Sequence, residues 1–212
     1  MSPVTKDMND TARIAWISGW GTAPDSLRPL AEKLAPGVRH TFLPPISGAV
    51  QAVLGQDCVV GWSLGAWRVM EAAARGVALP EKVILLAPFV AFCSEYNLGG
   101  RCSVTQVRYL RRWIERDSGA ALADFFSRAK LGPAPLLLPC GKDDLFEGLD
   151  RLAEDASPVL RHFASQGLPR GWEAIVGDCD PLLDGVAVAR SLPGCRIAAG
   201  AGHRPEELLA AL

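Results

Sequence analysis

Several features that define other classes of protein are scarce or missing in this sequence. Only three histidines occur in 212 residues, and no group of His, Cys, Asp or Glu has the spacing of a metal site. The net charge of -1 lacks the basic excess that binding to nucleic acid requires. No apolar run reaches the ~20 residues of a membrane-spanning helix. We therefore expect no metal, no nucleic acid and no membrane partner.

Signatures of cofactor binding, disulfides and secretion are also missing. The segment Gly19-Trp20-Gly21 has no third glycine at the offset of a dinucleotide site, and there is no P-loop, so no cofactor is expected. The six cysteines are scattered without a CxxC pair, which favours reduced thiols. The N-terminus, MSPVTKDMND, is polar and lacks the apolar core of a signal peptide. We expect a cytoplasmic monomer with one domain spanning residues 1–212.

The order of apolar runs predicts the fold class. Short apolar runs that end at Gly, Pro or polar residues alternate with segments of helical spacing, such as 25–34 and the residues after Ser63. The expected strands cover 13–17, 40–43, 58–60, 83–87, 135–140, 172–176 and 196–199. Runs without polar alternation are typical of strands covered on both faces. The sequence therefore predicts an α/β protein with a mostly parallel, doubly wound sheet.

The alternation of strands and helices breaks between about residues 89 and 134. Here helices are expected over 104–117 and 120–129, and we interpret them as a helical cap inserted into the sheet domain. The sequence leaves open whether the cap extends to residue 167. It also leaves open whether 143–166 forms one helix or two.

One motif carries chemistry. Gly61-Trp62-Ser63-Leu64-Gly65 is a G-x-S-x-G sequence between an apolar strand and a helix, which is the context of a nucleophile elbow. Glycines two residues on either side of the serine avoid clashes in such a sharp turn. The start of the helix directs backbone N–H groups toward developing negative charge. We therefore predict that Ser63 is a nucleophile; the alternative is an idle serine in an ordinary turn.

A second segment offers oxyanion donors. Ser18-Gly19-Trp20-Gly21 follows the first strand, where this kind of fold places one donor. The backbone N–H groups of Trp20 and Leu64 are the candidates, each worth roughly 3 kcal/mol of barrier. An apolar acyl pocket is expected nearby, and Trp20 and Leu64 are predicted to line it. Further candidate linings, equally consistent with core packing, are Trp62, Phe89, Phe92, Trp113, Phe125 and Phe126.

The general base is predicted from its position in the chain. His203 lies in a glycine-flanked loop after the last expected strand, whereas His40 begins an early strand and His162 lies within an expected helix. The order Ser…Asp…His is the one that α/β-hydrolases use. His203 is therefore the predicted base.

The acid is predicted from the loop after the strand at 172–176. Hydrolases of this type commonly have G-x-x-D here, a pattern that selects Asp180 after Gly177. Asp178 is then interpreted as a turn residue whose side chain caps nearby amides. Asp143 and Asp144, after the expected strand at 135–140, are a lesser alternative. We predict that Asp180 orients His203, which removes the proton of Ser63.

With these residues in place, the sequence resembles the α/β-hydrolase superfamily over nearly its full length. Within it, the segments Trp16–Gly21 and Val60–Trp67 are most similar to the pimeloyl-[acyl-carrier protein] methyl ester esterases of biotin synthesis, which carry Gly-Trp-Gly and Gly-Trp-Ser-Leu-Gly. The resemblance implies a carboxylesterase that releases methanol from the ω-methyl ester of a pimeloyl chain on acyl carrier protein. Ser18 stands where a histidine usually precedes Gly-Trp-Gly.

A local excess of positive charge is consistent with such a partner. Residues 101–130 hold seven basic and three acidic side chains. Within this segment the candidate contacts to acyl carrier protein are Arg108, Arg111, Arg112 and Arg116. Such a helix would attract an acidic partner helix and a phosphate; a solvated helix face is the alternative. Two other functions compete, namely a general esterase or thioesterase for small acyl substrates, and a non-catalytic protein on the same fold.

Overall fold

The protein is built on a six-stranded parallel sheet. The computed structural model describes residues 12–155 and 157–212, so the N-terminal segment MSPVTKDMND lies outside the described residues. The strands run in the order β2-β1-β3-β4-β5-β6 and every pairing is parallel. Their bounds are β1 (Arg13–Ile17), β2 (Arg39–Leu43), β3 (Cys58–Trp62), β4 (Lys82–Leu86), β5 (Trp172–Gly177) and β6 (Cys195–Ala198). The predicted α/β class with a parallel sheet is confirmed.

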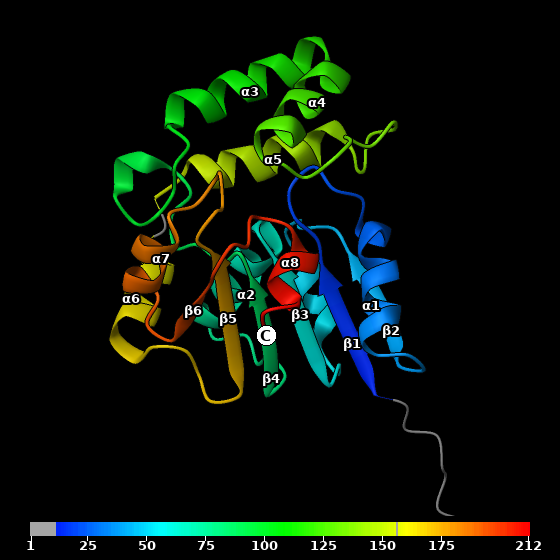
Figure 1. Cartoon of the computed structure of the whole chain (residues 1–212), viewed down its shortest axis with the longest axis vertical. Helices are drawn as coiled ribbons and strands as arrows, with labels where there is room; N and C mark the ends of the chain where they lie inside the picture. The colour runs from blue at the N-terminus through cyan, green and yellow to red at the C-terminus, as the bar shows by residue number, and fades with distance from the viewer. Residues whose placement is uncertain (1–11, 156) are drawn as a thin grey trace, which may run out of the picture.

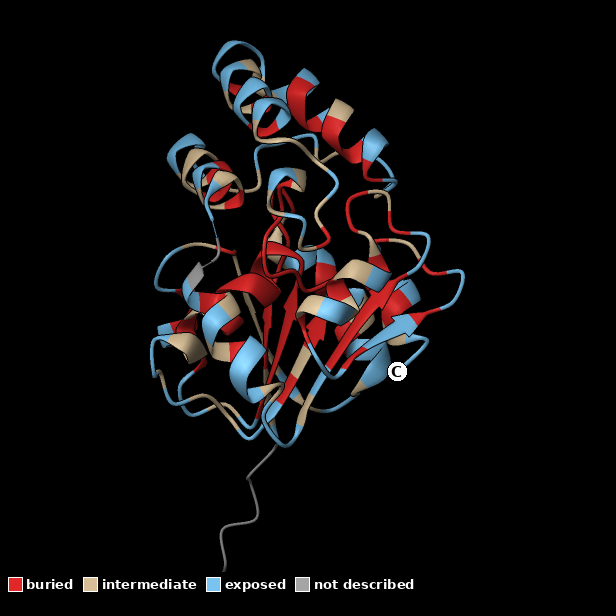
Figure 2. Cartoon of the chain, turned by 90° about the vertical axis from the view of Figure 1, so that its left-hand side faces the viewer, coloured by how far each residue is buried: buried red, intermediate tan, exposed pale blue. Residues whose placement is uncertain are grey.

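Helices cover both faces of this sheet. They are η1 (Pro24–Leu27), α1 (Arg28–Leu34), η2 (Ala49–Val53), α2 (Leu64–Ala74), η3 (Ser94–Tyr96), α3 (Val104–Arg116), α4 (Ser118–Arg128), α5 (Lys142–Ala153), α6 (Ser157–Gln166), α7 (Gly185–Ser191) and α8 (Pro205–Leu209). Helix α2 packs against β3 and α6, and α8 packs on the opposite face against β4 and β5 (Figure 1). Because both faces are covered, the central strands are buried along most of their length (Figure 2). This explains their lack of polar alternation.

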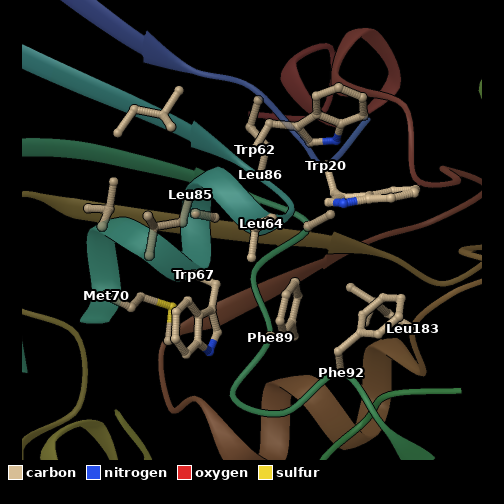
Figure 3. Packing of buried hydrophobic residues seen from close by; sticks show 14 of the residues in the cluster. Trp20, Trp62, Leu64, Trp67, Met70, Leu85, Leu86, Phe89, Phe92 and Leu183 are labelled. Atoms are coloured by element: carbon tan, nitrogen blue, oxygen red, sulfur yellow. The ribbon is translucent and has the colours of Figure 1, made fainter. Parts of the chain in front are cut away.

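The main core holds the helix that follows β3 against the sheet. Leu64 and Met70 of α2 belong to one buried cluster with Leu85 of β4 and with Phe89 beyond it (Figure 3). Each of these side chains is at most 1% exposed. The N-terminus of α2 is therefore held rigidly at the end of β3.

Helices α3, α4 and α5 form a layer above the carboxyl ends of the strands (Figure 1), which we call the cap. Arg111 of α3 joins α5, because its Nε donates to Asp150 Oδ1 at 3.1 Å and its guanidinium lies over the Phe146 ring, 4.6 Å from the centroid. The segment 143–166, left open by the sequence, contains two helices. Helix α5 belongs to the cap layer, whereas α6 packs beside the sheet against α2.

The strand predicted over 135–140 is wrong. Strand β4 pairs directly with β5, and residues 131–141 form an irregular loop between α4 and α5. Pro135 and Pro139 flank Leu136, Leu137 and Leu138 in this loop, and a proline cannot donate to a sheet ladder. Leu136 and Leu137 are 102% and 83% exposed.

Among the described residues, no helix combines the length and the hydropathy needed to cross a bilayer.

Candidate active site

Ser63 lies at a sharp turn between β3 and α2. Its φ of 54° and ψ of -118° lie outside the conformations that most residues adopt. The backbone N–H of Ser63 still donates to Leu86 O at 2.8 Å, which continues the ladder between β3 and β4 by one residue. Although Ser63 is the N-cap of α2, its side chain caps no backbone amide. Its hydroxyl therefore remains available for another partner.

The two glycines of the elbow are required by close backbone approaches. A Cβ on Gly61 would lie within 3.0 Å of the Ala66 backbone, and one on Gly65 would lie within 3.0 Å of the Ile17 and Ser18 carbonyl oxygens. Gly65 thus allows α2 to pack against the end of β1. The same contact brings the segment after β1 close to Ser63, because both segments leave the sheet at neighbouring strands.

The structure brings the three predicted catalytic side chains together. His203 Nε2 lies 2.9 Å from Ser63 Oγ, and His203 Nδ1 lies 2.7 Å from Asp180 Oδ2. Because an ionised carboxylate can only accept, the arrangement favours a proton on Nδ1 and leaves Nε2 to accept from the Ser63 hydroxyl. The exposed fractions of Ser63, Asp180 and His203 are 8%, 0% and 2%.

The loop that carries His203 is held at several points. Asp178 Oδ1 accepts from the Gly200 N–H at 2.7 Å, Glu207 Oε2 accepts from the Gly202 N–H at 2.6 Å, and Trp62 Nε1 donates to His203 O at 2.9 Å. Asp178 therefore caps an amide, as expected, and it does not contact His203. Glu207 was not predicted, because nothing in the sequence marks this helical glutamate as a partner of a loop amide.

Asp180 is oriented by the backbone that follows it. Its Oδ1 accepts from the N–H groups of Leu182 and Leu183, at 2.8 and 3.1 Å, which leaves Oδ2 for His203. Arg101 Nη1 donates to the Asp180 carbonyl oxygen at 2.8 Å, and the Arg101 N–H donates to Leu182 O at 2.9 Å. Sequence analysis did not find this role of Arg101, because 79 residues separate it from Asp180.

The predicted oxyanion donors flank the same hydroxyl. Leu64 begins α2 directly after Ser63, and Trp20 lies in the turn after β1. In the part of the chain that the structure describes, the backbone N–H groups of Trp20 and Leu64 donate to no protein group. The indole of Trp20 is buried beneath the cap, where its Nε1 donates to Leu145 O of α5 at 2.9 Å. Its ring lies edge-on to Phe125 of α4, with the centroids 4.8 Å apart.

The alternative residues from the sequence lie elsewhere. Asp143 and Asp144 are in the first turn of α5, where Asp144 Oδ2 accepts from the Gly141 N–H at 3.2 Å. His40 Nδ1 accepts from Trp16 Nε1 at 3.1 Å, and His162 lies on α6. None of these side chains contacts Ser63 or His203.

A small cavity adjoins the site. It has a volume of about 250 Å³, which is below the roughly 300–1,000 Å³ of pockets for drug-sized ligands. Its apolar walls are Leu27, Trp62, Phe126, Leu131, Pro133 and Pro135, and Arg204 lies among its polar residues. Ser63 and His203 do not line the cavity themselves, but Trp62 and Arg204, which are next to them in the chain, do. Of the predicted lining residues, Trp62 and Phe126 thus border this space, whereas Trp20 and Leu64 do not.

The four candidate arginines of α3 differ in their surroundings. Arg111 is tied to Asp150 and Glu115, with ion-pair distances of 3.1 and 3.2 Å. Arg108, Arg112 and Arg116 are exposed, and within the described residues none of the three forms an ion pair. Trp113, another aromatic candidate, lies beside Tyr109 on α3.

No cysteine competes with Ser63 as a nucleophile. All six cysteines are free thiols. Burial raises the pKa of Cys58 and Cys140 to about 11 and the pKa of Cys93 and Cys195 to about 12. Reactive thiols need a lowered pKa. These side chains are therefore protonated at neutral pH.

Comparisons with known proteins support the fold. No protein-family model matches the sequence, and no curated protein matches it. Among solved structures, an esterase from Exiguobacterium antarcticum has a TM-score of 0.70 at 16% identity, covering 91% of this chain and 85% of its own. A hydrolase from Pseudomonas aeruginosa has a TM-score of 0.67 at 16% identity, covering 92% and 83%. An esterase from Thermogutta terrifontis has a TM-score of 0.63 at 14% identity, covering 94% and 85%.

The likeness to these enzymes concerns the arrangement of the sheet and its helices. These structures cover most of the chain, but their sequence identity to it is low. The comparison therefore defines the fold, and the chemistry has to be argued from the residues of the site. The chain has the α/β-hydrolase fold.

Proposed function

We propose that this protein is a serine carboxylesterase in which Ser63, His203 and Asp180 form the catalytic triad. The observation that carries the proposal is the unbroken chain of hydrogen bonds from the Ser63 hydroxyl through His203 to Asp180. A nucleophile, a base and an orienting carboxylate at these distances are the arrangement that acyl transfer requires. The likeness to solved esterases supports the same reaction class.

The first half of the reaction acylates Ser63. His203 Nε2 accepts the hydroxyl proton as Ser63 Oγ attacks the ester carbon, and Asp180 stabilises the imidazolium that forms. The backbone N–H groups of Trp20 and Leu64 donate to the oxyanion, each lowering the barrier by roughly 3 kcal/mol. His203 then returns the proton to the leaving alkoxide.

The second half regenerates the enzyme. Water takes the place of the alcohol and gives a proton to His203 as it attacks the acyl carbon. His203 then returns this proton to Ser63 Oγ as the bond between Oγ and the acyl carbon breaks and the carboxylic acid leaves. The positive φ of Ser63 and its uncapped side chain support this role, because both direct Oγ toward His203 rather than toward the helix backbone.

We further propose that the substrate is the methyl ester of a pimeloyl chain held on acyl carrier protein, in the cytoplasm. The segments Gly19-Trp20-Gly21 and Gly61-Trp62-Ser63-Leu64-Gly65 support this substrate through their resemblance to those esterases. The exposed arginines of α3, Arg108, Arg112 and Arg116, would receive the acidic partner. Cleavage would yield the free ω-carboxylate and methanol.

A general esterase or thioesterase for small acyl substrates is the second candidate. The contacts of Arg111 favour it, because this arginine is already bound to Asp150 and Glu115 and lies over Phe146. Arg111 is therefore less available to an incoming partner than the sequence suggested. The two candidates share the triad and differ only in what the cap recognises.

Kinetics on two substrates test the proposal. Wild-type protein should hydrolyse p-nitrophenyl acetate, and Ser63→Ala should lower kcat by at least 10³-fold, since removal of a triad member typically costs this much. With a carrier-bound methyl ester, the double variant Arg112→Ala/Arg116→Ala should lower the ratio of carrier-ester to acetate turnover at least tenfold. Arg170→Ala/Arg190→Ala, which removes two exposed arginines outside the cap, is the charge-matched control and should leave that ratio within twofold of wild type.

The two levels of the proposal fail separately. Acetate hydrolysis that survives Ser63→Ala would refute the esterase mechanism. An unchanged ratio in the arginine variant would refute docking of the carrier on α3 and favour the general esterase. Restoration of growth to a biotin-requiring strain that lacks its esterase, by wild type and not by Ser63→Ala, would support the specific substrate.

A further inference from the structure

Three consecutive leucines on the loop between α4 and α5 are not buried in the way their side chains favour. Leu136, Leu137 and Leu138 are 102%, 83% and 39% exposed. Leaving a leucine in water forfeits roughly 1.5–3 kcal/mol relative to full burial, and contiguous exposed apolar side chains usually mark a binding surface. We call the loop of residues 131–140 the leucine loop.

The leucine loop borders the cavity beside the active site. Its first half, Leu131, Pro133 and Pro135, lines the cavity together with Trp62 and Phe126. Leu131 and Ala134 also pack against the core. The loop is therefore anchored on the cavity wall at one end, and it lies at the edge of the cap on the side of α1 (Figure 1).

The backbone before the leucines has the features of a hinge. Lys130 and Gly132 have positive φ angles, of 54° and 90°. Gly132 adopts this conformation without strain, and a Cβ at this position would meet no atom within 4 Å. The loop has no regular structure as far as Gly141, the N-cap of α5. Because Pro133, Ala134 and Pro135 stay on the cavity wall and the core, movement of the leucines would be confined to the segment between Pro135 and Gly141, which lies outside α4 and α5.

The chemistry of the cavity indicates what the leucines cover. Its walls are mostly apolar, and the polar exceptions are Thr22, Ser26, Arg204 and Glu206. One side is formed by Trp62, whose indole N–H donates to the carbonyl of His203. A chain of methylene groups that extends from an ester at Ser63 past Trp62 would enter this space. Arg204 lies among the lining residues together with Glu206, and its Nε is 3.6 Å from Glu206 Oε2, so this end of the cavity carries a charge-paired polar rim.

We propose that the leucine loop closes over the cavity when an apolar acyl chain occupies it, and that Leu136, Leu137 and Leu138 set the preference of the enzyme for medium-length acyl chains. This inference rests on the proposed esterase function and adds its specificity element. The leucines would leave water only when a chain is present, so that the energy of their burial would favour longer acyl groups over acetyl.

Hydrogen exchange measured by mass spectrometry tests closure without catalysis. Sodium octanoate, the product of an octanoyl ester, is added to full-length protein, and exchange is followed in the peptide that covers 131–141. We expect octanoate to slow exchange in this peptide at least fivefold and acetate at the same concentration to leave it unchanged. The variant Leu136→Ser/Leu137→Ser should lose this protection. The control Leu54→Ser/Val186→Ser, which replaces two exposed apolar residues outside the loop, should keep it.

Hydrolysis of p-nitrophenyl octanoate and acetate gives the second readout. The ratio of kcat/KM for octanoate to that for acetate should fall about tenfold in Leu136→Ser/Leu137→Ser, which corresponds to 1.4 kcal/mol, and should not change in the control variant. If no ester is hydrolysed in a Ser63-dependent manner but octanoate still protects the loop, the esterase proposal fails and closure stands.

Two outcomes would overturn closure itself. One is exchange in 131–141 that octanoate does not alter, together with an unchanged octanoate-to-acetate ratio in the leucine variant. In the other, ligand-free wild-type protein sediments with phosphatidylcholine vesicles and the leucine variant does not, while octanoate has no effect on hydrogen exchange in 131–141. The second result would assign the leucines to a lipid surface instead.

Discussion

The conformation of a single residue determines where the nucleophile points. Ser63 has a positive φ, which costs on the order of 1–3 kcal/mol for a residue with a side chain. The structure retains it because Ser63 N–H donates to Leu86 O, and because Gly61 and Gly65 let strand, turn and helix approach closely. An ordinary turn at this position would leave the hydroxyl as a helix cap. The strain therefore has a use in orienting the nucleophile.

Asp180 provides the sharpest test at the level of one atom. Asp180→Asn keeps the size of the side chain but removes the negative charge and changes the preferred tautomer of His203, so kcat should fall by about 10⁴-fold. Asp178→Asn is the matched control, since an amide oxygen can still accept from Gly200 N–H, and it should lower kcat less than tenfold. Equal losses in steady-state ester hydrolysis would contradict the assignment of the acid.

The elbow glycine that faces β1 should be needed for stability. Gly65→Ala places a Cβ against the carbonyl oxygens of Ile17 and Ser18, and such overpacking costs about 3 kcal/mol of unfolding free energy. Gly119→Ala is a suitable control, because this glycine lies in α4 with no atom nearer than 3.6 Å. The control should be neutral or stabilise by about 0.5–1 kcal/mol. Urea unfolding measures both, and equal values would refute the steric explanation.

At the scale of secondary-structure elements, a buried arginine ties the cap to the elbow helix. The side chain of Arg68 on α2 is 3% exposed and forms an ion pair with Glu71 on the same helix at 3.3 Å and a further pair with Glu147 on α5. Its Nε also donates to Pro45 O at 3.2 Å, in the loop after β2. Three separate segments thus meet at one guanidinium. We expect this contact to fix the height of α5 above the sheet.

Removing that guanidinium should loosen the cap. Arg68→Met should lower the unfolding free energy by about 2 kcal/mol, because the hydrogen bonds of a buried guanidinium to charged groups are lost, although Glu71 and Glu147 keep Arg75 and Arg151 as partners. Arg75→Met is the control, since Arg75 is 63% exposed and contacts the same Glu71, and exposed pairs contribute about 0–1 kcal/mol. If denaturant unfolding gives equal losses of unfolding free energy for both variants, Arg68 does not hold α5 to α2 in the way proposed.

Elements that are defined by a short stretch of sequence could be predicted from the sequence. The prediction failed where a structure depends on which distant segments pack or pair with it. Strands such as β3 and β4 are continuous apolar runs, and the elbow motif is complete within Gly61–Gly65, so both were found. The run at 135–140 has similar apolar content, yet β4 and β5 pair directly and leave it no place in the sheet. The triad was predicted from chain order. The supporting contacts of Arg101 and Glu207 were not, because each joins positions that only the fold brings together.

At the scale of the whole molecule, buried thiols link stability to alkaline pH. Burial raises the pKa of Cys58 and Cys140 to about 11 and of Cys93 and Cys195 to about 12, from the ordinary thiol value of 9.0. Below about pH 8 these thiols are protonated in both the folded and the unfolded chain, so they add no pH dependence there. Between about pH 9 and 12 the unfolded chain ionises first, which stabilises the unfolded state.

The contribution of these thiols to the unfolding free energy should therefore be constant up to about pH 8 and fall above it. Cys195→Val should reduce the slope between pH 9 and 10.5, because it removes one group whose pKa differs between the two states. Urea unfolding at pH 7.5, 9.0, 9.75 and 10.5 measures the effect in both proteins. Parallel slopes for wild type and variant would contradict the contribution of Cys195.

The whole account depends on Ser63 being a nucleophile activated by His203. The most direct measurement is reaction with a fluorophosphonate probe, followed by peptide mapping of the adduct. The account predicts stoichiometric phosphonylation of Ser63 in wild type, none in Ser63→Ala, and labelling at least 10³-fold slower in His203→Ala. An unlabelled wild-type protein, or an adduct on any residue other than Ser63, would contradict it.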